Sequence, residues 1–163
     1  MAKKIKSILD KVMLLLTSIM LIATLLLLLW QVFSRYVLNS PSTFTNELLG
    51  FLLVWMSLFA ASYAFGSNEH LSFSLIKNKF TKWRMKLVNI LVNLFIVIFT
   101  ISIFIIGGMK AVTSKMSQLT PILQIPQGAL YIILPVSGLV ILVYILLNTI
   151  INAQLSKDGG DFH

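Results

Sequence analysis

Residues 30–71 read WQVFSRYVLNSPSTFTNELLGFLLVWMSLFAASYAFGSNEHL, and they close one hydrophobic run, turn, and open another. Asn39, Ser40 and Pro41 are turn-forming residues, and a proline restricts the residue before it to extended geometry. Arg35 stands before the turn and Glu47 follows it. This order of features predicts a membrane hairpin, in which two helices are joined by a short turn.

The composition places the rest of the chain in the bilayer as well. Of its 163 residues, 58% are hydrophobic and 11% are charged, with a mean hydropathy of +0.93. An ordinary soluble domain carries about 25% charged residues. No polar stretch is long enough to bury a core of its own. The sequence therefore predicts an all-α integral membrane protein, a single membrane domain over residues 1–163.

Four runs are long and apolar enough to cross a membrane, and we expect spans at approximately 12–36, 45–67, 87–109 and 128–153. The basic start resembles a signal peptide, but the apolar run is longer and lacks a small-residue cleavage site. We therefore expect the first helix to be retained. The third helix is expected to extend to about Leu119, where two Xaa-Pro steps, at Pro121 and Pro126, break it. Pro135 is expected to kink the fourth span.

Residues 71–86 have an apolar seam at helical spacing, with cations flanking and opposing it. This pattern is typical of an amphipathic helix that lies in the membrane interface. The alternative is a basic loop whose periodicity is incidental. The residues expected to contact membrane lipids are Phe73, Lys77, Lys79, Phe80, Lys82, Trp83 and Arg84.

The cations also predict the orientation. Of 13 Lys and Arg residues, ten lie in the N-terminal segment, the 71–86 segment and the C-terminal tail. The positive-inside rule then places both termini in the cytoplasm and the Arg35–Glu47 turn on the outer side. This distribution accounts for the net charge of +8, and we expect no nucleic-acid partner.

The sequence offers little that could do chemistry. There is no cysteine, and only five acidic residues and two histidines are present. No ionisable residue lies in the middle of a predicted span, where proton and cation carriers place one. We predict no catalytic residue, no cofactor and no metal site. Two alternatives stay open: a stand-alone, homodimeric small transporter, and a lipid-modifying membrane enzyme, for which only Glu69 and His70 come near to a site.

Other residues, and Glu69 and His70 with them, are candidates for structure or for an interface. Arg35 and Glu47 are expected to form an ion pair that joins the first two helices, or else to contact a partner at the outer face. Trp55 lies mid-span and is expected to pack against protein. Asn89 and Asn93 share a helical face and are expected to hydrogen-bond a neighbouring helix. The small residues Gly50, Ser57, Ala61 and Ala64 form a stripe along the second span.

In their order along the chain, several motifs together resemble the small membrane subunit of tripartite ATP-independent periplasmic (TRAP) transporters. Glu47 opens the second helix as in that family, although the preceding Thr45-Asn46 departs from its frequent Trp and second acidic residue. The other matching features are Gln31–Tyr36 (Q-x-F-x-R-Y), Val54-Trp55, Ala60-Ala61, Gly66 followed by His70, Thr120–Pro126 (T-P-x-L-x-I-P), Tyr131 and Pro135.

The resemblance implies a multi-pass protein of the bacterial inner membrane. Such a subunit binds a large membrane subunit that moves substrate by an elevator motion driven by a sodium gradient. A periplasmic substrate-binding protein delivers the solute, typically an organic acid such as a C4-dicarboxylate or a sialic acid. The resemblance places the sodium and substrate sites in the large subunit and gives the small subunit the role of a scaffold.

Overall fold

The computed structural model describes residues 1–40, 42–67 and 82–158, and their regular structure is entirely helical. Between Leu119 and Pro126 there is one isolated antiparallel bridge. The elements are α1 (Ala2–Tyr36), α2 (Thr43–Gly66), α4 (Lys82–Phe99), η1 (Thr100–Gly107), α5 (Gly108–Lys115), α6 (Gln127–Tyr131) and α7 (Ile133–Asp158).

Four helical stretches are long and apolar enough to span a membrane: Ala2–Tyr36, Thr43–Gly66, Ile90–Lys115 and Gln127–Gln154. The most apolar 18 residues of each stretch have a mean hydropathy between 1.9 and 2.8, which is typical of transmembrane helices. The prediction of an all-α membrane fold with four spans is therefore confirmed. The orientation of the termini stays a prediction.

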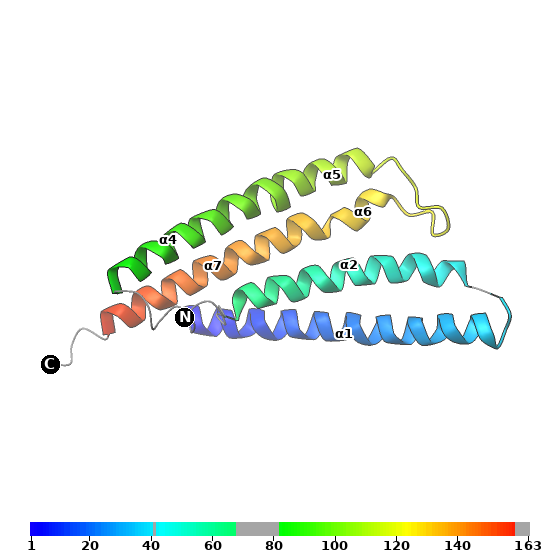
Figure 1. Cartoon of the computed structure of the whole chain (residues 1–163), viewed down its shortest axis with the longest axis horizontal. Coiled ribbons are helices and arrows are strands. Elements are labelled where there is room, and N and C mark those ends of the chain that lie inside the picture. The colour runs from blue at the N-terminus through cyan, green and yellow to red at the C-terminus, as the bar shows by residue number, and fades with distance from the viewer. Residues whose placement is uncertain (41, 68–81, 159–163) are drawn as a thin grey trace.

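The long helices lie side by side in the order α1, α2, α7 and then η1 with α5 (Figure 1). α1 also touches α7, because Ala2 packs with Leu147 and Ile151. The beginning of α1 and the end of α7 lie at one end of this array, which we call the terminal end. The turn between α1 and α2 and the loop between α5 and α6 lie at the other, the hairpin end (Figure 1).

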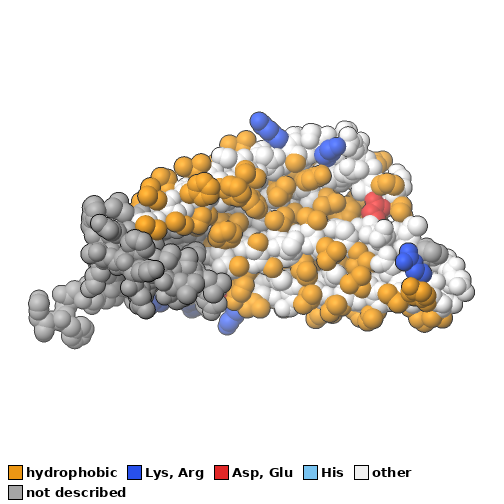
Figure 2. Space-filling view, in the orientation of Figure 1, with side chains coloured by type: hydrophobic (Ala, Val, Ile, Leu, Met, Phe, Trp, Pro, Cys, Tyr) orange, Lys and Arg blue, Asp and Glu red, His pale blue; other side chains and the backbone are white. Residues whose placement is uncertain are grey.

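The core is thin, as this side-by-side arrangement requires. Met13, Phe59, Ile133 and Tyr144 form its largest buried cluster. In the most apolar 18 residues of the third span, only 6% of the residues are buried within the chain. The corresponding share in the fourth span is 33%. Figure 2 shows hydrophobic side chains spread over the middle of the visible face. The visible face of the array therefore presents apolar surface, suited to lipid or to other membrane helices.

Two of the spans depart from regular α-helix. The third changes to π-helical turns over η1, and it ends at Lys115 rather than near Leu119 as predicted. The fourth is divided at Ile132, between α6 and α7, three residues before Pro135. A proline lacks the N–H that would bond to the carbonyl four residues earlier, which explains a break at this point.

α2 and α7 approach closely at Gly66. A Cβ added at this position would meet the ring of Tyr144 on α7, so only glycine fits there. Next to this contact, the hydroxyl of Ser62 donates to Leu58 O at 2.8 Å and approaches Ser137 O at 3.4 Å. Both serines are fully buried. Small residues and a hydroxyl thus bring α2 and α7 together, as in other membrane helix pairs.

Most of the predicted amphipathic segment lies outside the described residues. The candidate residues that also lie outside them are Glu69, His70, Phe73, Lys77, Lys79 and Phe80. Lys82, Trp83 and Arg84 belong to the first turn of α4, so the end of the predicted 71–86 segment is continuous with the third long helix.

Candidate functional site

Glu47 makes the most informative polar contact at the hairpin end. Its Oε2 accepts hydrogen bonds from the backbone N–H groups of Ile122 at 3.1 Å and Leu123 at 2.8 Å. A carboxylate on the first turns of α2 therefore holds a loop 75 residues further along the chain. Hydrogen bonds to a charged acceptor are stronger than neutral ones.

This loop, residues 116–126, is itself extensively hydrogen-bonded. The N–H of Thr120 donates to Ile125 O at 2.9 Å, and that of Gln127 donates to Gln118 O at 2.7 Å. The buried hydroxyl of Thr120 accepts from the N–H of Ile125. Gln124 has a φ of 55°, a left-handed conformation that closes the turn. Glu47 thus binds a loop of defined shape, which α5 and α6 anchor at its two ends.

The turn between α1 and α2 is built around Ser34, which is buried at the end of α1. Its hydroxyl donates to Ser40 O at 3.1 Å and accepts from the N–H of Ser42 at 3.2 Å. One turn earlier on α1, Gln31 Nε2 donates to Asn46 Oδ1 at 3.4 Å. These contacts are uncharged, and they join the two helices where an ion pair was expected.

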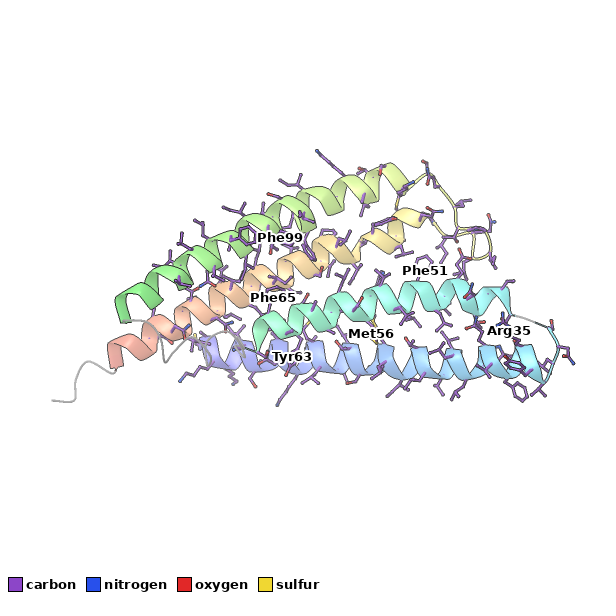
Figure 3. The ribbon with its side chains drawn as sticks, viewed as in Figure 1. Arg35, Phe51, Met56, Tyr63, Phe65 and Phe99 are labelled. Carbon is purple, nitrogen blue, oxygen red and sulfur yellow. The ribbon has the colours of Figure 1, made fainter. Side chains whose placement is uncertain are left out.

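The predicted ion pair between Arg35 and Glu47 is not seen among the hydrogen bonds of the described residues, and it stays a prediction. Among the described residues the hydrogen bonds of Glu47 run to the 116–126 loop, and none runs to Arg35. Arg35 is exposed at the end of α1 (Figure 3). The two charges lie close in sequence, but the loop supplies N–H groups that point at the carboxylate.

Trp55 packs against protein, as predicted. Its indole N–H donates to Leu130 O, at 3.2 Å, in the last turn of α6. That carbonyl lies just before the break between α6 and α7, so the indole satisfies an acceptor at an interrupted helix. Pro126, Tyr131 and Pro135 lie, respectively, before α6, at its end and in the first turn of α7. Trp55 thus ties α2 to the divided fourth span.

Asn93 is exposed on α4, and Asn89 lies one turn earlier in the same helix. Asn93 has no hydrogen bond to another helix in the described part of the chain, so its expected role between helices of this chain is not seen. The small-residue stripe of α2 is also exposed along its length, at Gly50, Ser57, Ala61 and Ala64. A Cβ added at Gly50 would meet nothing within 4 Å. Asn93 and the small-residue stripe of α2 therefore lie on the exposed surface of the chain.

Sequence reasoning missed the buried hydroxyls that fix the turns and the α2–α7 contact. Ser34, Thr45, Ser62, Thr120 and Ser137 are all buried and hydrogen-bonded. These residues could have been predicted only from the helical spacing of a serine or threonine relative to the apolar core residues. Many exposed serines and threonines in this chain have the same spacing, so the pattern does not identify the buried ones. The sequence also gave no reason to single out Asp10, whose Oδ1 is buried.

Several polar groups of the described residues fix turns, loops or helix contacts within the chain. Within residues 1–40, 42–67 and 82–158 there is no group of three or more His, Cys, Asp or Glu side chains that could hold a metal ion. The hairpin end combines a carboxylate-held loop, a serine-built turn and an exposed arginine. Its surface also includes exposed apolar side chains, among them Tyr36, Val37 and Ile122.

Comparison with known proteins agrees with these features. Residues 11–155 match the family described as "Tripartite ATP-independent periplasmic transporters, DctQ component". The chain is 25% identical over 124 residues, 76% of each protein, to a Haemophilus influenzae protein named a putative TRAP transporter small permease. It is 29% identical over 87 residues to the Vibrio cholerae sialic acid TRAP transporter small permease SiaQ, covering 53% of this chain and 50% of that protein.

The family match extends from the first span to the end of the fourth, so it includes the hairpin, the Glu47-held loop and the Trp55 contact. The family is a transporter component and not an enzyme, and the four apolar spans agree with a multi-pass protein of the bacterial inner membrane. The chain belongs to the DctQ family, the small membrane subunits of TRAP transporters.

Proposed function

We propose that this chain scaffolds the large membrane subunit of a sodium-coupled TRAP importer for an organic acid. A periplasmic binding protein delivers the solute to that importer, and the sodium and substrate sites lie in the large subunit. The observation that carries the proposal is the side-by-side helical array of a DctQ protein, whose apolar faces are left largely unburied within the chain. A single layer of helices of this kind extends a partner laterally in the membrane.

The exposed face of α2 is the best candidate for contact with the large subunit. Its small residues include Ser57, whose hydroxyl is satisfied within its own helix by Val54 O at 2.9 Å. A partner helix would therefore meet small side chains with no polar group left to pair. Association in lipid depends on such close packing, since the hydrophobic effect does not drive helices together there.

The hairpin end is proposed to face the periplasm, because ten of the 13 Lys and Arg residues belong to the N-terminal segment, residues 71–86 and the C-terminal tail. The 116–126 loop and Arg35 then lie on the side from which the binding protein approaches. The class of solute is proposed from the relatives: one of them is named for sialic acid, and a C4-dicarboxylate is the other acid that the family resemblance suggests.

The test is co-expression of this chain with the large subunit, followed by purification through a tag on the large subunit alone. We expect a stable complex that, with the binding protein and an inward sodium gradient, takes up the acid into liposomes. Liposomes holding only this chain should show no uptake. Uptake by the isolated chain would contradict the proposal and favour a stand-alone transporter.

A matched pair of variants tests the face. Ala61→Leu adds bulk to the exposed stripe of α2 and should reduce recovery of this chain with the large subunit. Ser18→Leu introduces the same side chain at an exposed small residue of α1 and should leave recovery unchanged. Equal recovery of both variants would show that the α2 stripe does not contact the large subunit.

A further inference from the structure

The first three turns of α1 pack against the rest of the chain along one face. Ala2 is buried and packs with Leu147 and Ile151 on α7. Leu9 packs against both buried clusters of the core, and Met13 is a buried member of the larger one. Ala2, Leu9 and Met13 are spaced by seven and four positions, so they form one stripe along the helix. The basic segment that precedes the first apolar run is therefore held in place as a helix.

The opposite face of these turns carries exposed groups that donate hydrogen bonds. Lys4, Ser7 and Lys11 are all exposed. At 3.6 residues per turn, they lie on the side of α1 opposite to Ala2 and Leu9. Along the helix axis, Ser7 is about 4.5 Å from Lys4 and about 6 Å from Lys11, so it lies between the two lysines. We call Lys4, Ser7 and Lys11 the cationic strip.

The charge around the cationic strip is mostly positive. Lys3 and Lys6 lie on the same turns, and Asp10 is the only acidic residue before Glu47. Asp10 is partly buried, and its Oδ1 is inaccessible to solvent. The complementary ligand is therefore an anion. Ammonium and hydroxyl groups both donate hydrogen bonds to phosphate oxygens, and the bonds from charged donors are the stronger ones.

An exposed apolar stripe runs beside the cationic strip and continues into the first span. It begins with Ile8 and Leu15, each four residues after a lysine of the strip, and continues with Ile22 and Leu29. The uncharged run of this span begins at Val12, so the strip lies just outside the hydrocarbon core, at the depth of the lipid headgroups. The strip and the stripe together match the two parts of a phospholipid, a charged headgroup and an acyl chain.

We propose that the cationic strip binds the headgroup of an anionic phospholipid, whose acyl chain lies along Ile8 and Leu15. The ammonium groups of Lys4 and Lys11 converge on the phosphate, and the hydroxyl of Ser7 donates to it from between them. Attraction to a negatively charged lipid surface increases with each lysine near it, so an anionic lipid is preferred to a zwitterionic one. The site is formed by this chain alone, and it depends neither on the proposed partners nor on the proposed orientation.

Native mass spectrometry of the purified full chain in detergent tests the site, with phosphatidylglycerol and phosphatidylcholine of identical acyl chains as probes. The wild type should bind phosphatidylglycerol more tightly. Lys4→Gln combined with Lys11→Gln should abolish most of this preference, because each lysine near the lipid adds roughly five-fold in affinity. Equal affinity of the wild type for the two lipids would overturn the proposal, whether or not the variants fold.

The matched control is Lys3→Gln combined with Lys6→Gln, which removes the same charge from the same turns and leaves the cationic strip intact. This variant should keep the preference for phosphatidylglycerol. An equal loss in both double variants would show a general attraction to the basic segment and would overturn the site.

Two further measurements exclude other occupants. An excess of inorganic phosphate should leave phosphatidylglycerol bound, because free phosphate makes no contact with the apolar stripe; displacement would identify a site for a soluble anion instead. A complex of this chain with its large subunit should also retain phosphatidylglycerol in a manner that depends on Lys4 and Lys11. Loss of the lipid on assembly would show that the partner protein covers the strip, and would overturn the lipid site.

Discussion

The carboxylate of Glu47 accepts a hydrogen bond from the backbone N–H of Leu123, at 2.8 Å, although 76 positions separate the two residues. The same oxygen accepts from the N–H of Ile122. One acidic side chain therefore fixes the geometry of the loop between the third and fourth spans.

We expect Glu47→Ala to destabilise this loop by about 1–2 kcal/mol, because two backbone donors lose a charged acceptor. Limited proteolysis of the purified chain should then cut within residues 116–126 faster than in the wild type. Glu47→Gln, which keeps one acceptor oxygen, should show a smaller increase.

Arg35→Ala is the matched control. It should leave the cleavage rate of the loop unchanged, and a cycle with Glu47→Ala should give a coupling energy near zero. A coupling above about 1 kcal/mol would mean that the two charges pair in the membrane after all.

The indole of Trp55 satisfies a carbonyl at a helix break, so Trp55→Phe should cost about 0.6–2 kcal/mol in unfolding free energy measured in detergent. Trp30→Phe, at an exposed tryptophan near the end of α1, should cost less than Trp55→Phe. Equal losses would indicate that the Trp55 hydrogen bond adds nothing to its packing.

Gly66 and Gly50 give a further pair. A methyl group at Gly66 meets the ring of Tyr144, so Gly66→Ala should lower stability by about 1–3 kcal/mol. Gly50→Ala, where nothing lies within 4 Å, should be neutral or slightly stabilising, since alanine favours helix. The comparison is made on the isolated chain. If Gly50→Ala is the more harmful of the two, the α2–α7 packing described here is incorrect.

The absence of native cysteine makes the orientation directly measurable. Ser117→Cys, exposed in the loop at the hairpin end, should react in whole cells with a maleimide that reaches the periplasm but does not cross the inner membrane. Lys3→Cys should react only after that membrane is permeabilised. The opposite pattern would reverse the proposed topology.

The sequence was sufficient for the four spans because hydropathy over about 20 residues is a strong signal. It was also sufficient to expect Trp55 against protein, since an indole at mid-span is far from either headgroup region. It failed at Glu47, because the donors that bind the carboxylate belong to a loop distant in sequence, whereas Arg35 was the charge close in sequence. Every residue except proline has a backbone N–H group, so the sequence does not indicate which of these groups bind a distant side chain. Such a contact can be identified only once the fold is known.

The end of the third helix shows the same limit. Proline positions predicted a helix continuing to about Leu119, but the chain leaves the helix after Lys115. The Lys115 side chain then donates to Gln118 Oε1 at 2.9 Å. The loop also needs residues 118 to 120 for its own hydrogen bonds. Here the hydrogen bonds of the following loop accompany the end of the helix, and the positions of the prolines alone do not reveal them.

The place of α7 has a consequence for biosynthesis. In the chain α7 follows the third span, yet in the array it lies between that span and α2 (Figure 1). The α1–α2 hairpin can form as soon as its two helices are inserted, but among the described elements the third span packs mainly on α6 and α7, which both belong to the fourth span. Insertion of the fourth span is thus the step that joins the two halves, and a ribosome stalled before Gln127 would leave the third span dependent on lipid or on its partner subunit.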